Sequence, residues 1–134
     1  MTDPVPARGL SPDEAAALAR LLSAERDATS TRIEELTREF DSIVESAALE
    51  APDDEHDPEG STIGFERAQV AALIDQARSR LRELERARRR LGDGTYGACE
   101  HCGNPIGLER LQARPGAQTC IRCAAGPRRA VRPR

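Results

Sequence analysis

The chain of 134 residues contains no tryptophan and no lysine, and only three of its side chains are aromatic: Phe40, Phe65 and Tyr96. Because aromatic side chains supply much of the buried area of large globular cores, this scarcity argues against such a core. Charged residues make up 32% of the chain, and Ala, Leu, Glu and Arg are prominent. This composition favours long helices.

Long apolar runs are also absent. No run approaches the roughly twenty apolar residues that a helix needs to span a bilayer, and we expect no signal peptide. We therefore expect a cytoplasmic protein with no membrane partner. Acidic residues are scarce in one half only: residues 1–85 carry a net charge of −11 and residues 86–134 a net charge of +8. Such asymmetry indicates a partner that meets the two halves differently.

All four cysteines stand in two Cys-x-x-Cys pairs, Cys99 with Cys102 and Cys120 with Cys123, separated by seventeen residues. Two pairs at this spacing are typical of a structural zinc site, because a two-residue gap lets one tight turn direct two sulfurs to one metal. Gly103 supplies the backbone freedom for that turn. Four cysteines leave no coordination position for water, so we predict one structural Zn²⁺ per chain and no catalytic residue.

Two disulfides or free thiols are the alternatives to zinc, and cytosolic thiols stay reduced, which favours the metal. His101 lies beside two of the cysteines and could replace a ligand, although the set of four is already complete. A thiol-based redox sensor stays open as a rival function, since zinc sites made only of thiolates can lose their metal on oxidation.

The sequence predicts two long helices. The segment Ser11-Pro12-Asp13-Glu14 has the residues of a capping box, and no Pro or Gly follows until Pro52. Apolar residues then recur at steps of three and four, as in a coiled-coil seam. In the first helix these are Ala15, Ala19, Leu22, Ile33, Leu36, Phe40, Ile43 and Ala47, with Arg26 and Thr29 interrupting. Leu18 and Leu21 lie off the seam and could cover the cysteine region.

A turn separates the two helices at residues 50–60, which contain two prolines and a glycine. Ser61 or Thr62 can cap the second helix, which should end near Leu91 and Gly92. Its seam residues are Val70, Ile74, Ala77, Leu81, Leu84 and Leu91, with Arg88 interrupting. Matching seams and a short connection favour antiparallel packing within one chain, and hence a monomer, over pairing between chains.

The predicted fold is mainly α, an antiparallel coiled-coil hairpin followed by a small four-cysteine zinc finger. Its segments are a disordered N-terminus at 1–10, the hairpin at 11–91 with its tip at 50–60, the finger at 92–125 and a basic tail at 126–134. Tyr96 is expected to anchor the finger to the helices, because stacking surfaces for nucleic acids usually carry several aromatic residues.

A dense pattern of residues surrounds the cysteines. It comprises Gly94-Thr95-Tyr96-Gly97, Cys99-Glu100-x-Cys102-Gly103, Ile106, Arg110-Leu111, Ala113, Pro115 and Cys120-Ile121-x-Cys123. This pattern resembles the zinc-finger signature of the DksA/TraR family, bacterial transcription regulators that bind RNA polymerase. The resemblance implies a transcription regulator with RNA polymerase as its partner, and not an enzyme.

The hairpin tip is acidic, with seven carboxylates and no arginine in residues 45–59. Acidic turns are common on protein surfaces, so the alternative to a functional tip is a solvated turn. The resemblance implies more, because family members insert an Asp-x-x-Asp-x-Ala tip into the secondary channel of RNA polymerase. Asp54 and Asp57 match both aspartates, and Glu59 replaces the alanine. The change from alanine to Glu59 is expected to alter the size and direction of the effect on transcription more than it alters docking to the polymerase.

The basic half suggests further contacts. Arg86, Arg89, Arg90 and Arg114 are candidates to contact the polymerase or phosphate, and the alternative is a solvated helix face paired with Glu85. A zinc-ribbon nucleic-acid-binding protein is therefore a second rival, although we expect no sequence-specific DNA contact.

The resemblance does not extend to one effector site. Some family members bind guanosine tetraphosphate through basic residues sixteen positions before the first cysteine and directly after the last. Glu83 and Ala124 stand at these two places. Of the basic residues that those family members use for the nucleotide, only Arg114 is retained, in the run Leu111-x-Ala113-Arg114-Pro115. Dependence on this nucleotide is not expected by that route.

Overall fold

The computed structural model describes residues 9–49 and 58–126, and within these ranges it contains four helices. They are α1 (Pro12–Leu49), α2 (Pro58–Asp93), α3 (Leu108–Ala113) and α4 (Ile121–Ala125). The expected mainly helical fold, with two long helices followed by the cysteine region, is confirmed. None of the helices in the described ranges has the length and apolar character needed to cross a membrane.

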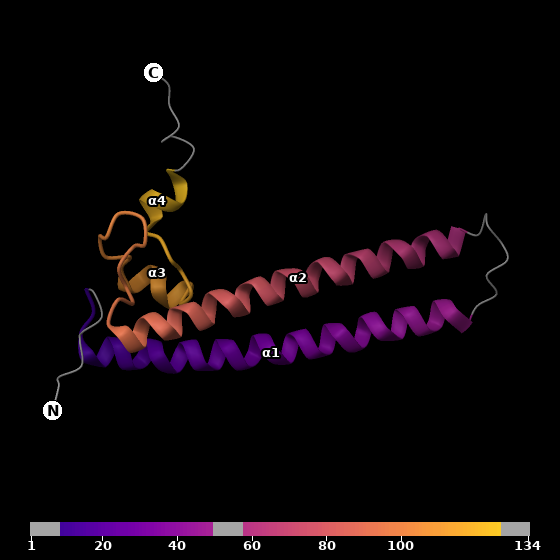
Figure 1. Ribbon diagram of the computed structural model, residues 1–134, viewed down its shortest axis with the longest axis horizontal. Coiled ribbons are helices and arrows are strands. Elements are labelled where there is room, and N and C mark those ends of the chain that lie inside the picture. The colour runs from indigo at the N-terminus through magenta and orange to yellow at the C-terminus, as the bar shows by residue number, and fades with distance from the viewer. Residues whose placement is uncertain (1–8, 50–57, 127–134) are drawn as a thin grey trace, which may run out of the picture. The chain divides into compact units, whose positions relative to one another are not determined.

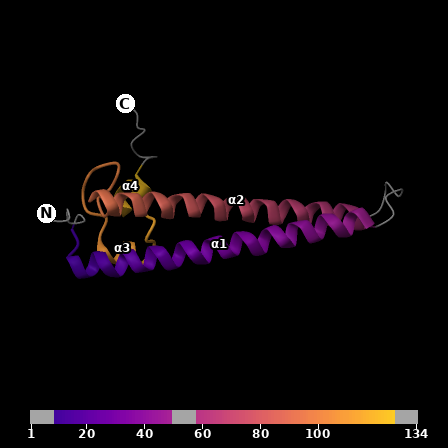
Figure 2. The same ribbon diagram turned by 60° about the horizontal axis from the view of Figure 1, so that its bottom comes forward.

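The chain divides into two compact units. We call residues 1–26 with 82–134 the finger unit and residues 27–81 the hairpin unit. Within each unit, the segments of α1 and α2 lie side by side and run in opposite directions, as both views show (Figures 1 and 2).

The first helix begins with the predicted capping box. The Ser11 N–H donates to Glu14 Oε1 at 3.0 Å, and the Glu14 N–H donates to Ser11 Oγ at 3.1 Å. Leu10, directly before this cap, is buried and shares a hydrophobic cluster with Ala15 in the first turns of α1. Leu10 therefore belongs to the folded core, as in a hydrophobic staple. The prediction of a disordered N-terminus at 1–10 is therefore wrong for Leu10, and residues 1–8 lie outside the described ranges.

The second helix begins earlier than predicted. Its first residue is Pro58, and neither Ser61 nor Thr62 is the cap. Proline suits the first position of a helix because its fixed φ is helical and its missing N–H would have no helical partner there. The predicted turn at 50–60 therefore overlaps the first turn of α2, which contains Glu59.

The second helix also ends later than predicted, at Asp93 instead of Leu91 or Gly92. Gly94 follows with φ +82°, and its N–H donates to the Leu91 carbonyl at 3.4 Å. The Thr95 N–H donates to the Arg90 carbonyl at 2.9 Å. These two bonds form a Schellman motif, which needs a left-handed residue and therefore places the stop at Gly94.

The core of the hairpin unit follows the predicted seam. Leu36, Val70 and Ile74 are buried together, and partly buried side chains pack against them. These are Phe40, Ile43 and Ala77. Thr29, a predicted interruption of the seam, is also buried, with 8% of its surface exposed.

The finger unit has its own core, which joins the two helices to the cysteine region. Its buried members are Leu10, Leu18, Leu22, Leu84, Ala87, Tyr96, Cys99, Ile106 and Leu111. Leu18 thus covers the cysteine region, as expected. On α2 the seam passes through Ala87 and leaves Arg88 exposed, so the predicted interruption is wrong by one position.

Tyr96 joins this core to the loop after α3. Its side chain is 2% exposed, and its hydroxyl donates to the Pro115 carbonyl at 2.8 Å. Burial raises the pKa of Tyr96 to about 12, so the hydroxyl remains a donor at neutral pH. The structure therefore gives Tyr96 the expected anchoring position in the finger unit.

Candidate metal centre

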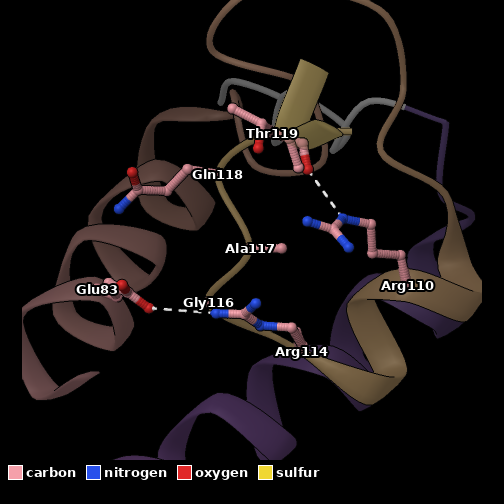
Figure 3. A pocket seen from close by; sticks show the side chains of 8 residues that line it. Glu83, Arg110, Arg114, Gly116, Ala117, Gln118 and Thr119 are labelled. Atoms are coloured by element: carbon pink, nitrogen blue, oxygen red, sulfur yellow. Dashed lines mark hydrogen bonds and ion pairs between the residues drawn. The ribbon is translucent and has the colours of Figure 1, made fainter. Parts of the chain in front are cut away.

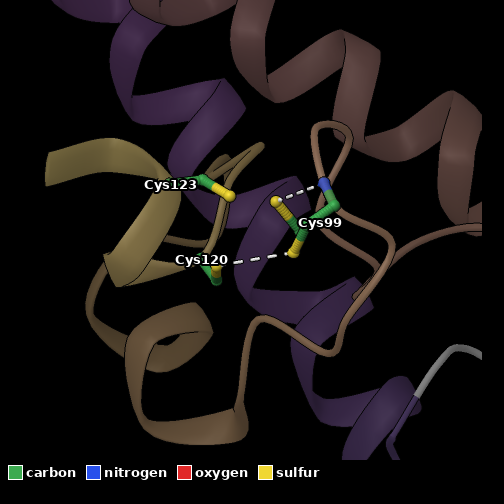
Figure 4. Close-up of side chains that lie close together, drawn as sticks. Cys99, Cys120 and Cys123 are labelled. Carbon is green, nitrogen blue, oxygen red and sulfur yellow. Dashed lines mark hydrogen bonds between the residues drawn. The ribbon is translucent and has the colours of Figure 1, made fainter. Parts of the chain in front are cut away.

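The four cysteines converge on one point in the finger unit. Their Sγ atoms all lie within 4.8 Å of one another, and Cys102 Sγ lies 3.9 Å from Cys120 Sγ. Figure 4 shows the sulfurs of Cys99, Cys120 and Cys123 turned toward one another, with Cys99 in a loop, Cys120 directly before α4 and Cys123 within α4. A tetrahedral zinc with bonds of about 2.3 Å has ligand sulfurs about 3.8 Å apart, so the donor set fits this metal.

The first pair of cysteines is held by a tight loop. The Cys99 N–H donates to the Asn104 carbonyl at 2.8 Å, and the Gly103 N–H donates to the Cys99 carbonyl at 2.9 Å. Gly103 has φ +81°, a conformation that residues with a Cβ atom rarely adopt, so this turn favours glycine. The loop thereby presents both sulfurs on one side.

Backbone N–H groups also surround the sulfur of Cys99. Burial opposes ionisation of this thiol, but N–H groups of Cys102, Cys120 and His101 stabilise the thiolate, and the pKa of Cys99 falls to about 6. The His101 and Cys102 N–H groups lie 3.4 Å from the sulfur. Cys99 is therefore prepared to act as a thiolate ligand near neutral pH.

The second pair lies at the start of α4, where Cys120 is the N-cap residue and the Ala124 N–H donates to its carbonyl at 2.9 Å. The N–H of Cys123 is the main reason that the pKa of Cys120 is lowered. The two loops are joined by one backbone bond, from the Glu100 N–H to the Gln118 carbonyl at 2.8 Å. His101 is exposed and outside the group of four sulfurs.

Two of the four arginines predicted as external contacts bind inside the finger unit. Arg86 Nε and Nη2 donate to both carboxylate oxygens of Glu100 at 2.8 and 3.0 Å. Arg90 Nη1 approaches Glu100 Oε2 at 2.5 Å, and its side chain is only 19% exposed. Hydrogen bonds from Arg86, together with Arg90, hold the pKa of Glu100 below its usual range. Arg89 and Arg114 are exposed.

Sequence reasoning missed the role of Glu100. The pattern around the cysteines includes this residue, but nothing local indicates that two arginines ten and fourteen positions earlier reach it. The signal available was their spacing: Arg86 and Arg90 are four residues apart and so share one face of α2.

Three positions of this chain correspond to residues with which some DksA/TraR family members bind guanosine tetraphosphate. These positions line one pocket of about 310 Å³ (Figure 3). Glu83, Arg114 and Ala124 all line it, and Arg114 Nη2 lies 4.0 Å from Glu83 Oε1. Arg110 also lines the pocket and donates from Nε to the Thr119 carbonyl at 2.9 Å. The carboxylate of Glu83 offsets part of the positive charge that Arg110 and Arg114 bring to this pocket.

Comparisons with known proteins agree with the predicted resemblance. Residues 94–129 match the prokaryotic DksA/TraR C4-type zinc finger. The chain is 34% identical over 88 residues to the RNA polymerase-binding transcription factor DksA of Caulobacter vibrioides, covering 66% of this chain and 62% of that protein. It is 41% identical over 49 residues to the factor of the same name from Escherichia coli K12, covering 37% and 32% of the two chains.

A solved structure extends the likeness beyond the finger. The transcription factor DksA2 of Pseudomonas aeruginosa matches with a TM-score of 0.73 and 28% identity, over 90% of this chain and 87% of that one. The names of these relatives describe transcription factors, which agrees with the expectation that the chain is not an enzyme. The match to the Caulobacter relative spans about three fifths of that protein.

Proposed function

We propose, on the premise that the chain is a member of the DksA/TraR family, that it regulates transcription by binding RNA polymerase directly. One combined observation carries the proposal. The chain has two long antiparallel helices followed by a four-sulfur cluster, and 90% of it matches the structure of DksA2. The activity requires no reaction by the chain itself. Its site of action is the cytoplasm, together with the polymerase.

The four cysteines are proposed as the ligands of one structural zinc. Cys99, Cys102, Cys120 and Cys123 would hold the ion, and the ion would fix the two loops of the finger relative to each other. A complete thiolate set leaves no open position for water, so the zinc supplies folding energy and not chemistry.

The acidic tip is proposed to act inside the secondary channel of the polymerase. Asp54 and Asp57 lie outside the described ranges, and Glu59 stands in the first turn of α2. The proposal rests on the match of Asp54 and Asp57 to the two aspartates of the family tip, and it includes Glu59 because this residue stands where the family has alanine. Arg89 and Arg114 remain candidates for surface contacts, because both are exposed and Arg114 lies no closer than 4.0 Å to Glu83, whereas Arg86 and Arg90 are hydrogen-bonded to Glu100.

Replacing both aspartates by asparagine tests the tip. In the double variant Asp54→Asn with Asp57→Asn, the effect on run-off transcription should be lost while zinc content and helicity stay unchanged. Binding to the polymerase should weaken by about thirtyfold at most, because two lost surface charge interactions contribute together about 2 kcal/mol or less. The measurements are a run-off assay and a binding titration on the same preparations.

The matched control is Glu39→Gln with Asp41→Asn, which removes the same charge from exposed positions on α1. This control should keep the full effect on transcription. If the tip variant regulated transcription as well as the wild type, the assignment of the tip would be wrong, even with binding intact.

A further inference from the structure

Arg90 occupies a particular place beside the first cysteine. Its Nη2 donates to the Ala98 carbonyl at 2.8 Å and to the Thr95 carbonyl at 2.7 Å, and its Nη1 contacts the carboxylate of Glu100. Ala98 and Glu100 are the residues on either side of Cys99. One guanidinium therefore holds the chain both before and after a metal ligand.

The same residue is tied to the end of α2 through its main chain. The Arg90 carbonyl accepts the N–H groups of Thr95 and Tyr96 at 2.9 and 3.1 Å. Arg86, one turn earlier, donates to both oxygens of the Glu100 carboxylate and so shares Oε2 with Arg90. The first cysteine loop is thus connected to the last two turns of α2 by side-chain and main-chain bonds at once.

Glu100 also connects this group to the second pair of cysteines. Its N–H donates to the Gln118 carbonyl at 2.8 Å, two residues before Cys120. Its side chain is 21% exposed and that of Arg90 is 19% exposed, so the pair of these two residues is partly shielded from water and salt, whereas the Arg86 side chain is 51% exposed. Cys99 itself is buried in the core with Leu84 and Ala87 of α2. A change in Glu100 would therefore reach both loops of the metal centre.

We propose that Arg90 and Glu100 are positioning residues of the zinc site, which hold Cys99 in place so that zinc retention depends on the end of α2. Neither residue is a ligand; each acts through the backbone on either side of Cys99. This inference rests on zinc occupancy and is independent of any binding to the polymerase.

The test is the rate at which the zinc-loaded full chain releases its metal to a chromogenic chelator in excess. Glu100→Gln and Arg90→Gln should each release zinc about tenfold faster or more, the size of effect typical of residues that orient metal ligands. Arg90→Lys should not restore the rate, because a lysine lacks the planar fork that reaches three oxygens.

The two glutamine variants also separate positioning from a general effect of charge. Glu100→Gln removes a negative charge and Arg90→Gln removes a positive one, so an electrostatic effect on the thiolates would change zinc release in opposite directions. Positioning predicts that both accelerate release. Arg89→Gln, an exposed neighbour on the same helix, is the matched control and should release zinc at the wild-type rate.

The melting temperature of each variant shows whether Arg90 and Glu100 only stabilise the fold. Variants that melt earlier but release zinc at the wild-type rate below the transition would overturn the proposal, as would opposite changes in the two glutamine variants. Should Arg90→Gln fail to fold, the near-isosteric Glu100→Gln decides alone: unchanged release from that variant would refute the positioning role.

Discussion

Replacing Cys120 by serine is expected to abolish zinc binding and to unfold the finger. A structural zinc site contributes on the order of 10 kcal/mol to folding in small metal-binding domains, so loss of one ligand removes most of the driving force for residues 94–126. The core around Cys99, Tyr96 and Leu111 should open, because these buried side chains come from the segments that the metal would join. Elemental analysis should find one zinc in the wild type and none in the variant.

Tyr96 offers a direct measure of this unfolding. It is the only tyrosine of a chain without tryptophan, and it is buried in the finger unit. Its fluorescence therefore reports on that unit alone. In Cys120→Ser the emission should match that of the wild type treated with a strong chelator.

His101→Ala is the matched control for the metal site. His101 is exposed beside two of the cysteines, and its removal should leave both zinc content and Tyr96 emission unchanged. A Cys120→Ser protein with full zinc content, or one with no zinc and native Tyr96 emission, would contradict the proposed ligand set.

Leu36→Asp is expected to have the second large effect, in the hairpin unit. Leu36 is 2% exposed and packs with Val70 and Ile74 of α2. The substitution removes a buried leucine and places a carboxylate in an apolar environment, so the free energy of unfolding should fall by about 3–5 kcal/mol. Thermal unfolding followed by far-UV circular dichroism should show a lower midpoint and reduced helicity.

Ser42→Asp provides the matched comparison for Leu36→Asp. Ser42 is an exposed residue of α1, so this variant adds the same charge to the same helix without entering the core. Its melting curve should stay close to that of the wild type. Equal melting curves for Leu36→Asp and the wild type would show that the seam between α1 and α2 is not as described.

Much of the fold was accessible from the sequence, because local chemistry controls it. Apolar steps of three and four located Leu36, Val70 and Ile74 in the hairpin seam, and the Ser11–Glu14 capping box marked the start of α1. The spacing of the cysteines predicted their convergence. Each of these signals acts over a few residues or repeats along a helix.

The errors have physical causes that local patterns do not contain. The sequence pattern predicts the end of α2 at Gly92, but a helix tolerates an exposed glycine, and the left-handed conformation occurs at Gly94. The two prolines and the glycine of residues 50–60 predict a turn that includes Pro58, although proline is equally suited to the first position of a helix. Several neighbouring residues could end or begin a helix on local grounds, and contacts with the rest of the fold decide which of them does.

The internal role of Arg86 and Arg90 was the least predictable feature. A run of arginines at a helix end indicates a surface for anions, and only the folded finger brings Glu100 to these side chains. The difference is important for function, because these two arginines then stabilise the finger and leave Arg89 and Arg114 as the candidate outer contacts.

Direct association with RNA polymerase is the central claim, and gel filtration of the zinc-loaded chain with core RNA polymerase in the absence of DNA tests it most directly. We predict an equimolar complex that elutes with the polymerase, and no retention of the chain on duplex DNA under the same salt conditions. A chain that elutes apart from the polymerase, yet binds bare DNA in a salt-sensitive manner, would contradict the claim and favour a nucleic-acid-binding zinc ribbon.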